Sequence, residues 1–487
     1  NTSVGASAFT STVAGTTFSW TNSNTSIGLA SGGAGNTPIF TAVNAGSAPI
    51  TSIVSVTPTA NSCVGPPVSY TITVNPIPTV NAVPSATYCS GIAVPANTFT
   101  GSVTGTTYNW NNTNTTIGAP ASGVNTVAGF SASNVGATPI SGVITVTPTA
   151  NTCVGIPTSY TIAVNPIPTV NAVPSATYCS GIAVPANTFT GSVTATTFNW
   201  VNSNTTIGAA GSGVNTVTGF NATNTGASSI SGVITVTPTA NTCTGTPTSY
   251  TITVNPIPTV NVPPSASYCG GATVPVSTFS SNLATTIYSW SNSNSTIGLG
   301  ASGTGNAPSF IASNSGTTSI VGAITVTPSA SGCIGAPMNF SITVNPTPVA
   351  PSAADATICP NSSATLTATA PGGTYAWYDA QVAGNLLITN ATYTTPNLNT
   401  TTTYYVNTTN GFGCVSPFTP VAANVLNFLT VTASPNQTIC IGVTANLNAT
   451  PNGAGYTYSW DSPGSPAFST IVNPTITPVA TTIYTVT

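Results

Sequence analysis

The sequence contains no lysine, no arginine and no histidine, and only three acidic residues among 487. Soluble proteins carry about 25% charged residues, so this absence excludes whole classes of function. Nucleic acids, phosphorylated ligands and anionic membrane surfaces are bound through basic side chains, and this sequence has none. Catalysis by histidine, Schiff-base chemistry at lysine and histidine-ligated metal sites are excluded in the same way. We therefore expect no nucleic-acid partner.

The three acids are Asp355, Asp379 and Asp461, and they lie in separate segments of the sequence. A calcium site needs several oxygen ligands with clustered carboxylates. No serine or tyrosine has a plausible general base nearby, so nucleophilic catalysis has no support. We expect no catalytic residues, no metal, no cofactor and no enzymatic activity.

Long apolar runs and strong helix formers are also missing. No apolar run approaches the roughly 18 residues that a membrane-spanning helix needs, so we expect no direct membrane insertion. No signal peptide is visible at Asn1, and we expect any export signal to lie outside this sequence. Leucine, glutamate, lysine and glutamine are scarce or absent, which disfavours helices. Short runs of Val, Ile, Thr, Tyr and Phe between Gly, Pro, Asn and Ser clusters are typical of strands and turns.

The sequence repeats itself with a period of 90 residues. The 30 residues at 75–104 recur without change at 165–194. Three series of residues keep this spacing: Trp20, Trp110, Trp200 and Trp290; Cys89, Cys179, Cys269 and Cys359; Cys63, Cys153, Cys243 and Cys333. Two shorter relatives follow, the first with Trp377 and Cys414 and the second with Cys440 and Trp460. We predict six domains, numbered here as repeats 1 to 6: 1–75, 76–165, 166–255, 256–345, 346–427 and 428–487.

The two ends of the sequence predict that it is a piece of a longer protein. The spacing from Cys89 to Trp110 places the first cysteine of repeat 1 just before Asn1. At the other end, TTIYTVT matches the stretch TTTYYVNTT that precedes Cys414, so repeat 6 stops before its second cysteine. We therefore expect repeat 1 to be truncated at its N-terminus and repeat 6 at its C-terminus.

Each repeat is predicted to be a β-sandwich in an all-β chain. Tyr160, Ile162 and Val164 alternate with Ser159, Thr161 and Ala163, a period of two that gives one buried and one solvated face. About seven short strands with a tryptophan on the third favour an immunoglobulin-like sandwich, with other small β-sandwiches as the alternative. Core positions are therefore predicted for Trp20, Trp110, Trp200, Trp290, Trp377 and Trp460. The polar run after Trp110 leaves a sugar-stacking platform as the alternative.

An Asn-Pro-x-Pro motif marks each boundary between the first five repeats. Two prolines favour an extended and rather stiff connection, although the motif could also mark only the start of a strand. We predict linker roles for Pro76, Pro78, Pro166, Pro168, Pro256, Pro258, Pro346 and Pro348. Such spacers would hold the domains end to end in an elongated rod on the order of 200 Å long.

The ten cysteines predict disulfides and hence an oxidising or extracellular setting, with free buried thiols as the alternative. Three connectivities are open. We favour pairing within a repeat, which joins Cys89–Cys153, Cys179–Cys243, Cys269–Cys333 and Cys359–Cys414 and leaves Cys63 and Cys440 for partners outside the sequence. The second connectivity pairs cysteines 26 residues apart, such as Cys63 with Cys89. The third joins one domain to the next, for example Cys89 to Cys243.

Several segments resemble a known family of surface proteins. NPIPTVNAVPSATYCSG, TTYNW, GVITVTPTANTCVG and SYTIAVNP resemble the PKD-like repeats of giant Bacteroidota surface proteins. In repeat 5, CPNSSATLTATAPGGTYAWYDA and TTTYYVNTTNGFGCVSP resemble the immunoglobulin-like domains of the same proteins. The resemblance covers essentially the whole sequence. It implies export by type IX secretion and display on the cell surface, as in gliding-motility adhesins, and it carries over no catalytic residues.

These features together predict a structural stalk segment of a long extracellular adhesin filament, for surface attachment or gliding motility. Its partners would be an external surface or polysaccharide, bound by regions outside this sequence, and the gliding or outer-membrane machinery. Two alternatives remain: an array of glycan-binding modules that uses exposed aromatic and asparagine side chains, and a non-catalytic spacer in a large secreted enzyme.

Overall fold

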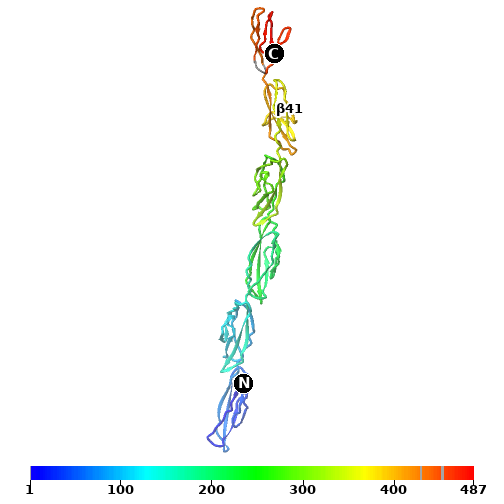
Figure 1. The fold of residues 1–487 in the computed structure, drawn as a ribbon. Coiled ribbons are helices and arrows are strands. Elements are labelled where there is room, and N and C mark those ends of the chain that lie inside the picture. The colour runs from blue at the N-terminus through cyan, green and yellow to red at the C-terminus, as the bar shows by residue number, and fades with distance from the viewer. Residues whose placement is uncertain (1, 428–429, 451–454) are drawn as a thin grey trace. The chain divides into compact units, whose positions relative to one another are not determined.

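The chain folds into β-strands and short turns. The computed structural model describes residues 2–427, 430–450 and 455–487. Regular structure consists of strands and four 3₁₀ helices, and no α-helix occurs in these three ranges. No helix within them has the length and apolar character needed to cross a membrane. Figure 1 shows that successive stretches of the chain form separate groups of strands. The predicted all-β class is confirmed.

Repeat 2 shows the arrangement that repeats 3 and 4 follow closely. Its elements are β8 (Ala86–Cys89), β9 (Ala93–Val94), β10 (Asn97–Thr98), β11 (Thr107–Asn112), η2 (Thr115–Ile117), β12 (Ser122–Val124), β13 (Thr126–Val127), β14 (Phe130–Ser131), β15 (Ile140–Ala150), β16 (Cys153–Val154) and β17 (Thr158–Asn165). The main sheet has the order β12-β11-β15-β17-β8, with β16 paired to β15. Two small sheets, β10 with β13 and β9 with β14, provide the second layer.

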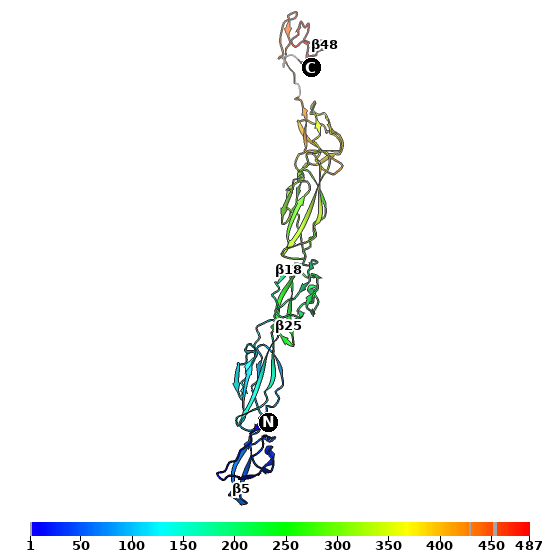
Figure 2. The same cartoon turned by 60° about the horizontal axis from the view of Figure 1, so that its bottom comes forward.

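The other repeats contain corresponding elements. Repeat 1 contains β1 (Ser3–Val4), β2 (Thr17–Asn22), η1 (Thr25–Ile27), β3 (Gly32–Ala34), β4 (Phe40–Thr41), β5 (Ile50–Ala60), β6 (Cys63–Val64) and β7 (Val68–Val74). Repeat 3 contains β18 (Ala176–Cys179), β19 (Ala183–Val184), β20 (Asn187–Thr188), β21 (Thr197–Asn202), η3 (Thr205–Ile207), β22 (Ser212–Val214), β23 (Thr216–Val217), β24 (Phe220–Asn221), β25 (Ile230–Ala240), β26 (Cys243–Thr244) and β27 (Thr248–Asn255). Figure 2 labels β18 and β25 in the same group of strands, where both pair with β27.

Repeat 4 contains β28 (Ala266–Cys269), β29 (Thr273–Val274), β30 (Ile287–Asn292), η4 (Ser295–Ile297), β31 (Ser302–Thr304), β32 (Phe310–Ile311), β33 (Ile320–Ala330), β34 (Cys333–Ile334) and β35 (Met338–Asn345). Repeat 5 contains β36 (Ser352–Ala353), β37 (Ala356–Ile358), β38 (Thr365–Thr369), β39 (Thr374–Tyr378), β40 (Leu386–Ile388), β41 (Thr392–Thr394), β42 (Thr402–Thr409) and β43 (Thr419–Val425). Repeat 6 contains β44 (Thr432–Ala433), β45 (Ala445–Asn446), β46 (Ala449–Thr450), β47 (Trp460–Ser462), β48 (Ser465–Ser469), β49 (Thr475–Ile476) and β50 (Thr485–Val486).

The first strand of repeat 2 runs parallel to the last strand. β8 pairs with β17 so that Ala86 lies opposite Ile162 and Cys89 lies opposite Asn165. β17 itself is antiparallel to β15, and its side chains Tyr160, Ile162 and Val164 are buried. The alternation read from the sequence therefore corresponds to one face on the core and one face toward solvent.

Hydrophobic cores form within repeats. Among the residues that the structure describes, six clusters of buried side chains occur, and each draws its members from one repeat: 20–74, 94–164, 184–254, 260–344, 364–423 and 449–460. The chain divides into two compact units, Asn1–Ile257 with Ser331–Cys333 and Pro258–Ala330 with Ile334–Thr487. Each sandwich thus has its own core.

The six tryptophans belong to these cores. Trp200 is 3% exposed and Trp377 is fully buried, and the other four are exposed by 6% or less. The indole N–H of Trp110 donates to the Thr126 carbonyl at 3.1 Å. Gly123 lies so close to this ring that a Cβ atom would be 2.5 Å from it, which explains a glycine at this position. A ring enclosed in this way cannot stack on a sugar, so the sugar-platform alternative is wrong for these residues.

We predict that Trp200→Ala destabilises repeat 3 by about 3–5 kcal/mol, because it removes a buried indole and leaves a cavity. The measurement is hydrogen–deuterium exchange of peptides around β21, with the corresponding peptides around β11 in repeat 2 as the control in the same molecule. Faster exchange confined to repeat 3 is the expected result. Unchanged exchange at β21 would contradict a core role for Trp200.

Candidate functional site: the junctions between repeats

Each hairpin cysteine follows a tight turn. In repeat 2, β15 and β16 are joined by Asn151 and Thr152, whose φ angles are +47° and +72°. Positive φ at both central residues is typical of the type I′ turn, which matches the twist of a two-residue hairpin. Asn241 and Thr242 repeat this geometry in repeat 3. The turn places Cys153, like its counterpart Cys243, at one end of the sandwich.

The two cysteines of one repeat lie at opposite ends of the sandwich. Cys89 is in register with Asn165, the last residue of β17. Cys153 lies in the hairpin that precedes Thr158, the first residue of the same strand. A strand of this length rises by roughly 23 Å, whereas a disulfide requires Cα atoms within about 7 Å of each other. A bond between Cys89 and Cys153 is therefore geometrically impossible.

Three disulfides join cysteines of successive repeats. The bonded pairs and their Cα–Cα distances are Cys89–Cys243 at 5.7 Å, Cys179–Cys333 at 5.6 Å and Cys269–Cys414 at 5.6 Å. The pairing within repeats that we favoured from the sequence is wrong, for Cys89–Cys153, Cys179–Cys243, Cys269–Cys333 and Cys359–Cys414 alike. The pairing of cysteines 26 residues apart is also wrong. The connectivity is the third one, in which the first-strand cysteine of one repeat reaches the hairpin cysteine of the next.

Four cysteines are free thiols: Cys63, Cys153, Cys359 and Cys440. Cys153 and Cys359 were predicted to form disulfides, and the structure leaves both unbonded. Cys153 nevertheless lies in a hairpin equivalent to that of Cys243. Cys89 and Cys243 are 154 residues apart. The same separation would place a partner for Cys153 at position −1 (153 − 154), two residues before Asn1. A free Cys153 therefore follows from the same rule that pairs the others.

A side-chain amide accompanies the disulfide between repeats 2 and 3. Asn165, at the end of β17, donates through Nδ2 to the carbonyl of Asn241 in the next hairpin, at 2.9 Å. The Asn165 carbonyl accepts from the N–H of Ser90 at 2.9 Å, which ties the same residue to the turn after Cys89. Cys243 is only 1% exposed. The disulfide thus has a buried sulfur at Cys243 and a half-buried one at Cys89, beside groups that are already hydrogen-bonded.

Corresponding amide bonds occur at other junctions. Asn255 donates to the Ser331 carbonyl at 2.9 Å, within the first compact unit. Asn75 donates to the Asn151 carbonyl at 2.9 Å, although no disulfide is present there. The contact between an asparagine and the next hairpin therefore does not require the covalent bond.

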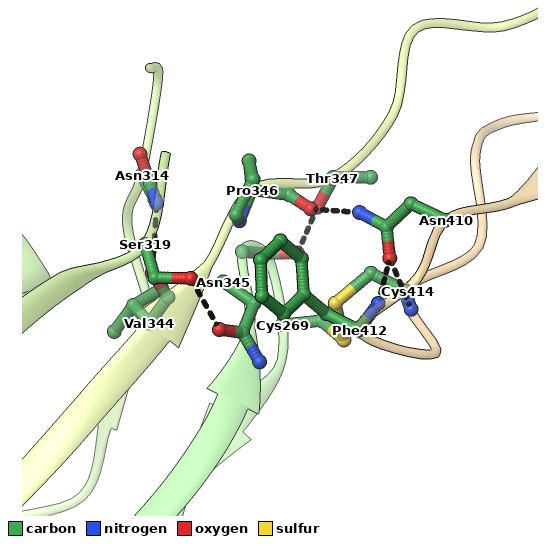
Figure 3. The surroundings of a disulfide bond; sticks show 11 residues. Cys269, Asn314, Ser319, Val344, Asn345, Pro346, Thr347, Asn410, Phe412 and Cys414 are labelled. Atoms are coloured by element: carbon green, nitrogen blue, oxygen red, sulfur yellow. Dashed lines mark hydrogen bonds between the residues drawn. A yellow bond between two sulfur atoms is a disulfide. The ribbon is translucent and has the colours of Figure 1, made fainter. Parts of the chain in front are cut away.

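Figure 3 shows the junction between repeats 4 and 5, where the hairpin supplies the asparagine. Asn410 donates through Nδ2 to the Pro346 carbonyl at 2.8 Å, while its Oδ1 accepts from the N–H groups of Phe412 and Cys414 at 3.0 Å. Thr347 donates from its hydroxyl to the Gly270 carbonyl at 2.7 Å, next to Cys269. Linker, first-strand turn and hairpin are joined around one disulfide.

The linker prolines are packed into these junctions. All are buried except Pro348, which is half-buried; the buried ones are Pro76, Pro78, Pro166, Pro168, Pro256, Pro258 and Pro346. The Pro78 carbonyl lies 1.9 Å from where a Cβ atom on Gly155 would be, so this hairpin position requires glycine. The prolines thus act as part of a packed joint between linker and hairpin, and their predicted role as stiff spacers stays a prediction.

The remaining candidates serve local structure. Asp355 and Asp461 accept backbone hydrogen bonds from Ala422 at 2.8 Å and from Ala467 at 2.5 Å. Within the described ranges, no group of three or more metal-ligating side chains occurs. Asn114 accepts from the Thr116 N–H at 3.0 Å as the cap of η2, so its place in the polar run after Trp110 is structural.

Asp379 accepts two hydrogen bonds in repeat 5. Asn385 donates to its carboxylate from the side-chain amide at 2.9 Å and from the backbone N–H at 2.6 Å, and these bonds lower the pKa of Asp379 below its ordinary value of 3.8. In the same repeat, burial raises the pKa of Tyr404 to about 12. Neither group titrates near neutral pH.

The comparisons with known proteins concern the immunoglobulin-like fold. Residues 348–426 match the family described as "Ig-like domain CHU_C associated", which confirms the resemblance of repeat 5 to such domains. Among curated proteins, none matches the chain. One similar solved structure is Sidekick-1 immunoglobulin domains 1–5, at 10% identity and a TM-score of 0.27, covering 84% of this chain and 92% of that chain. Another is titin domains I67–I69, at 11% identity and a TM-score of 0.32, covering 53% of this chain and 97% of that chain. A third is the protocadherin GammaB4 extracellular domain, at 12% identity and a TM-score of 0.30, covering 84% of this chain and 77% of that chain.

The sheet topology and the family match of repeat 5 identify the chain as a tandem array of immunoglobulin-like β-sandwich domains. Its three disulfides indicate a secreted or extracellular protein. The match to the family lies within repeat 5, and the PKD-like character of repeats 1 to 4 stays a prediction.

We predict that a cysteine placed two residues before Asn1 bonds to Cys153. A copy of residues 84–90, added in front of Asn1, would supply a strand equivalent to β8 that can pair with β7. The measurement is mass-spectrometric mapping of chymotryptic peptides without reduction, because the chain has no trypsin sites. The same extension with serine in place of the cysteine is the control. A Cys153 thiol that still reacts with iodoacetamide in the folded, extended chain would contradict the pairing rule.

We predict that the thermal stability of repeat 5 is independent of pH between about 5 and 7 and declines in acid. A lowered pKa means that Asp379 contributes stability fully above its ordinary value of 3.8 and loses it as the pH falls through the lowered value. Thermal unfolding followed by calorimetry between pH 2 and 7 measures this. Asp379→Asn should flatten the acid decline of this repeat, and an unchanged decline would show that other groups cause it.

Proposed function

We propose that the chain is a non-catalytic, structural stalk segment of a long extracellular adhesin filament. The observation that carries this proposal is that disulfides join successive repeats instead of closing each repeat on itself. A bond within one repeat would constrain only the fold of that repeat. Bonds between repeats hold the relation of one domain to the next, which is what a stalk requires.

The chemistry of the chain supports this proposal. A chain without lysine and arginine offers no cleavage site to trypsin-type proteases. With three acidic side chains and no basic ones, its contacts within and between domains depend little on ionic strength. Both properties suit a protein exposed to a variable exterior.

The finer parts of the proposal extend the family resemblance. Type IX secretion would export the chain, and the cell surface would display it. The filament would serve surface attachment or gliding motility, gripping an external surface or polysaccharide through regions outside this sequence. The gliding or outer-membrane machinery would hold its other end. The six buried tryptophans weigh against the alternative of a glycan-binding array, because they were the aromatic side chains proposed to stack on sugars.

We predict that the purified chain appears in negative-stain electron micrographs as a thin beaded filament, with beads roughly 40 Å apart. Its length should be the same at low and high salt, because few charges are available to be screened. Immunogold labelling of intact cells with antibodies against the chain is the companion measurement. Compact globules in the micrographs, or labelling confined to the cell interior, would contradict the stalk.

A further inference from the structure

The three disulfides form a covalent path that omits most of the chain. Cys89 is bonded to Cys243, and Cys269 is bonded to Cys414. Between these two bonds lie only the 26 residue steps from Cys243 to Cys269 (269 − 243), compared with 325 steps from Cys89 to Cys414 along the backbone (414 − 89). A force applied to the two ends of the chain therefore has a route that avoids residues 90–242 and 270–413.

The short route runs through elements that are already extended. Residues 243–269 contain β26, β27, the Asn-Pro-x-Pro linker and β28. Fully stretched, 26 residues span at most about 90 Å, whereas 325 residues would span about 1,100 Å. Under tension the short route becomes taut first, and residues 90–242 and 270–413, which carry most of the cores, are not stretched.

The third disulfide links the two omitted segments. Cys179 lies between Cys89 and Cys243, and its partner Cys333 lies between Cys269 and Cys414. The short route does not use this bond. If the Cys89–Cys243 bond is absent, the shortest route becomes 154 steps, from Cys89 to Cys179 and then from Cys333 back to Cys269 (90 and 64 steps). The interleaved bonds therefore still limit the stretched length between Cys89 and Cys414 after the Cys89–Cys243 bond is lost.

We propose that the disulfides act as a load-bearing tether that limits how far repeats 2 to 5 can be extended under tension. The tension would be transmitted along the filament, and this inference therefore rests on the proposed stalk function. The tether follows from which cysteines are bonded to one another. Repeat folding and tether length are separate properties, because the tether is covalent and the cores are not.

The test is force spectroscopy of the full chain held at its two ends, with disulfide pairing verified beforehand by peptide mapping of each protein. The wild-type chain is compared with the double variants C89S/C243S and C179S/C333S, each of which removes one disulfide. We expect C89S/C243S to lengthen the fully stretched chain by 128 steps (154 − 26), or roughly 450 Å. C179S/C333S should leave the stretched length unchanged, although it also removes a native bond. Reduction of the wild-type chain should release the full backbone length.

Two results would overturn the tether. One is a wild-type chain that stretches to its full backbone length without a reductant. The other is an equal gain in length for both double variants. Because the stretched length depends on covalent connectivity alone, incomplete folding of a variant does not alter the comparison. If the tether fails while electron micrographs still show beaded filaments, the stalk function stands and only this inference falls.

Discussion

In repeats 2 to 5, the first strand of the main sheet runs parallel to the last strand, and this pairing decides where the cysteines lie. Parallel register carries Cys89 to the end of the sandwich at which the chain leaves it, beside Asn165. The hairpin before the last strand carries Cys153 to the end at which the chain enters. One repeat therefore presents a cysteine at each end, and each can bond only to a neighbouring repeat. The asparagine amide bonds, the packed prolines and the disulfides of the junctions all depend on this geometry.

A chain almost without charge must stabilise its solvated sheet faces with other groups. Hydrogen bonds between hydroxyl groups on neighbouring strands do this. The Thr145 and Ser159 hydroxyl oxygens lie 2.9 Å apart, and so do those of Thr235 and Ser249. Cross-strand pairs of this kind contribute roughly 0.2–1 kcal/mol each. Because hydroxyl groups do not titrate in the physiological range, the stability they provide is insensitive to pH and salt. This is consistent with a stalk that keeps its properties in different surroundings.

The disulfides add covalent links between successive repeats, and these links also do not depend on pH in the physiological range or on salt. A loop of about 150 residues closed by one bond is stabilised by about 5 kcal/mol in the chain-entropy view. The loops here overlap, since Cys179 lies inside the loop that Cys89 and Cys243 close. Bonds within single repeats would leave the linkers as the only covalent connection between domains.

The sequence by itself determined the fold of each repeat. A period of two along Tyr160, Ile162 and Val164 requires a strand with one buried face, and a tryptophan every 90 residues requires one core per repeat. Both are local properties, because side-chain alternation and turn residues act over a few positions. Only the tertiary structure decided the disulfide connectivity. Sequence spacing allowed all three pairings, and strand direction chose among them by separating Cys89 from Cys153 along the length of β17 and placing Cys89 beside Cys243.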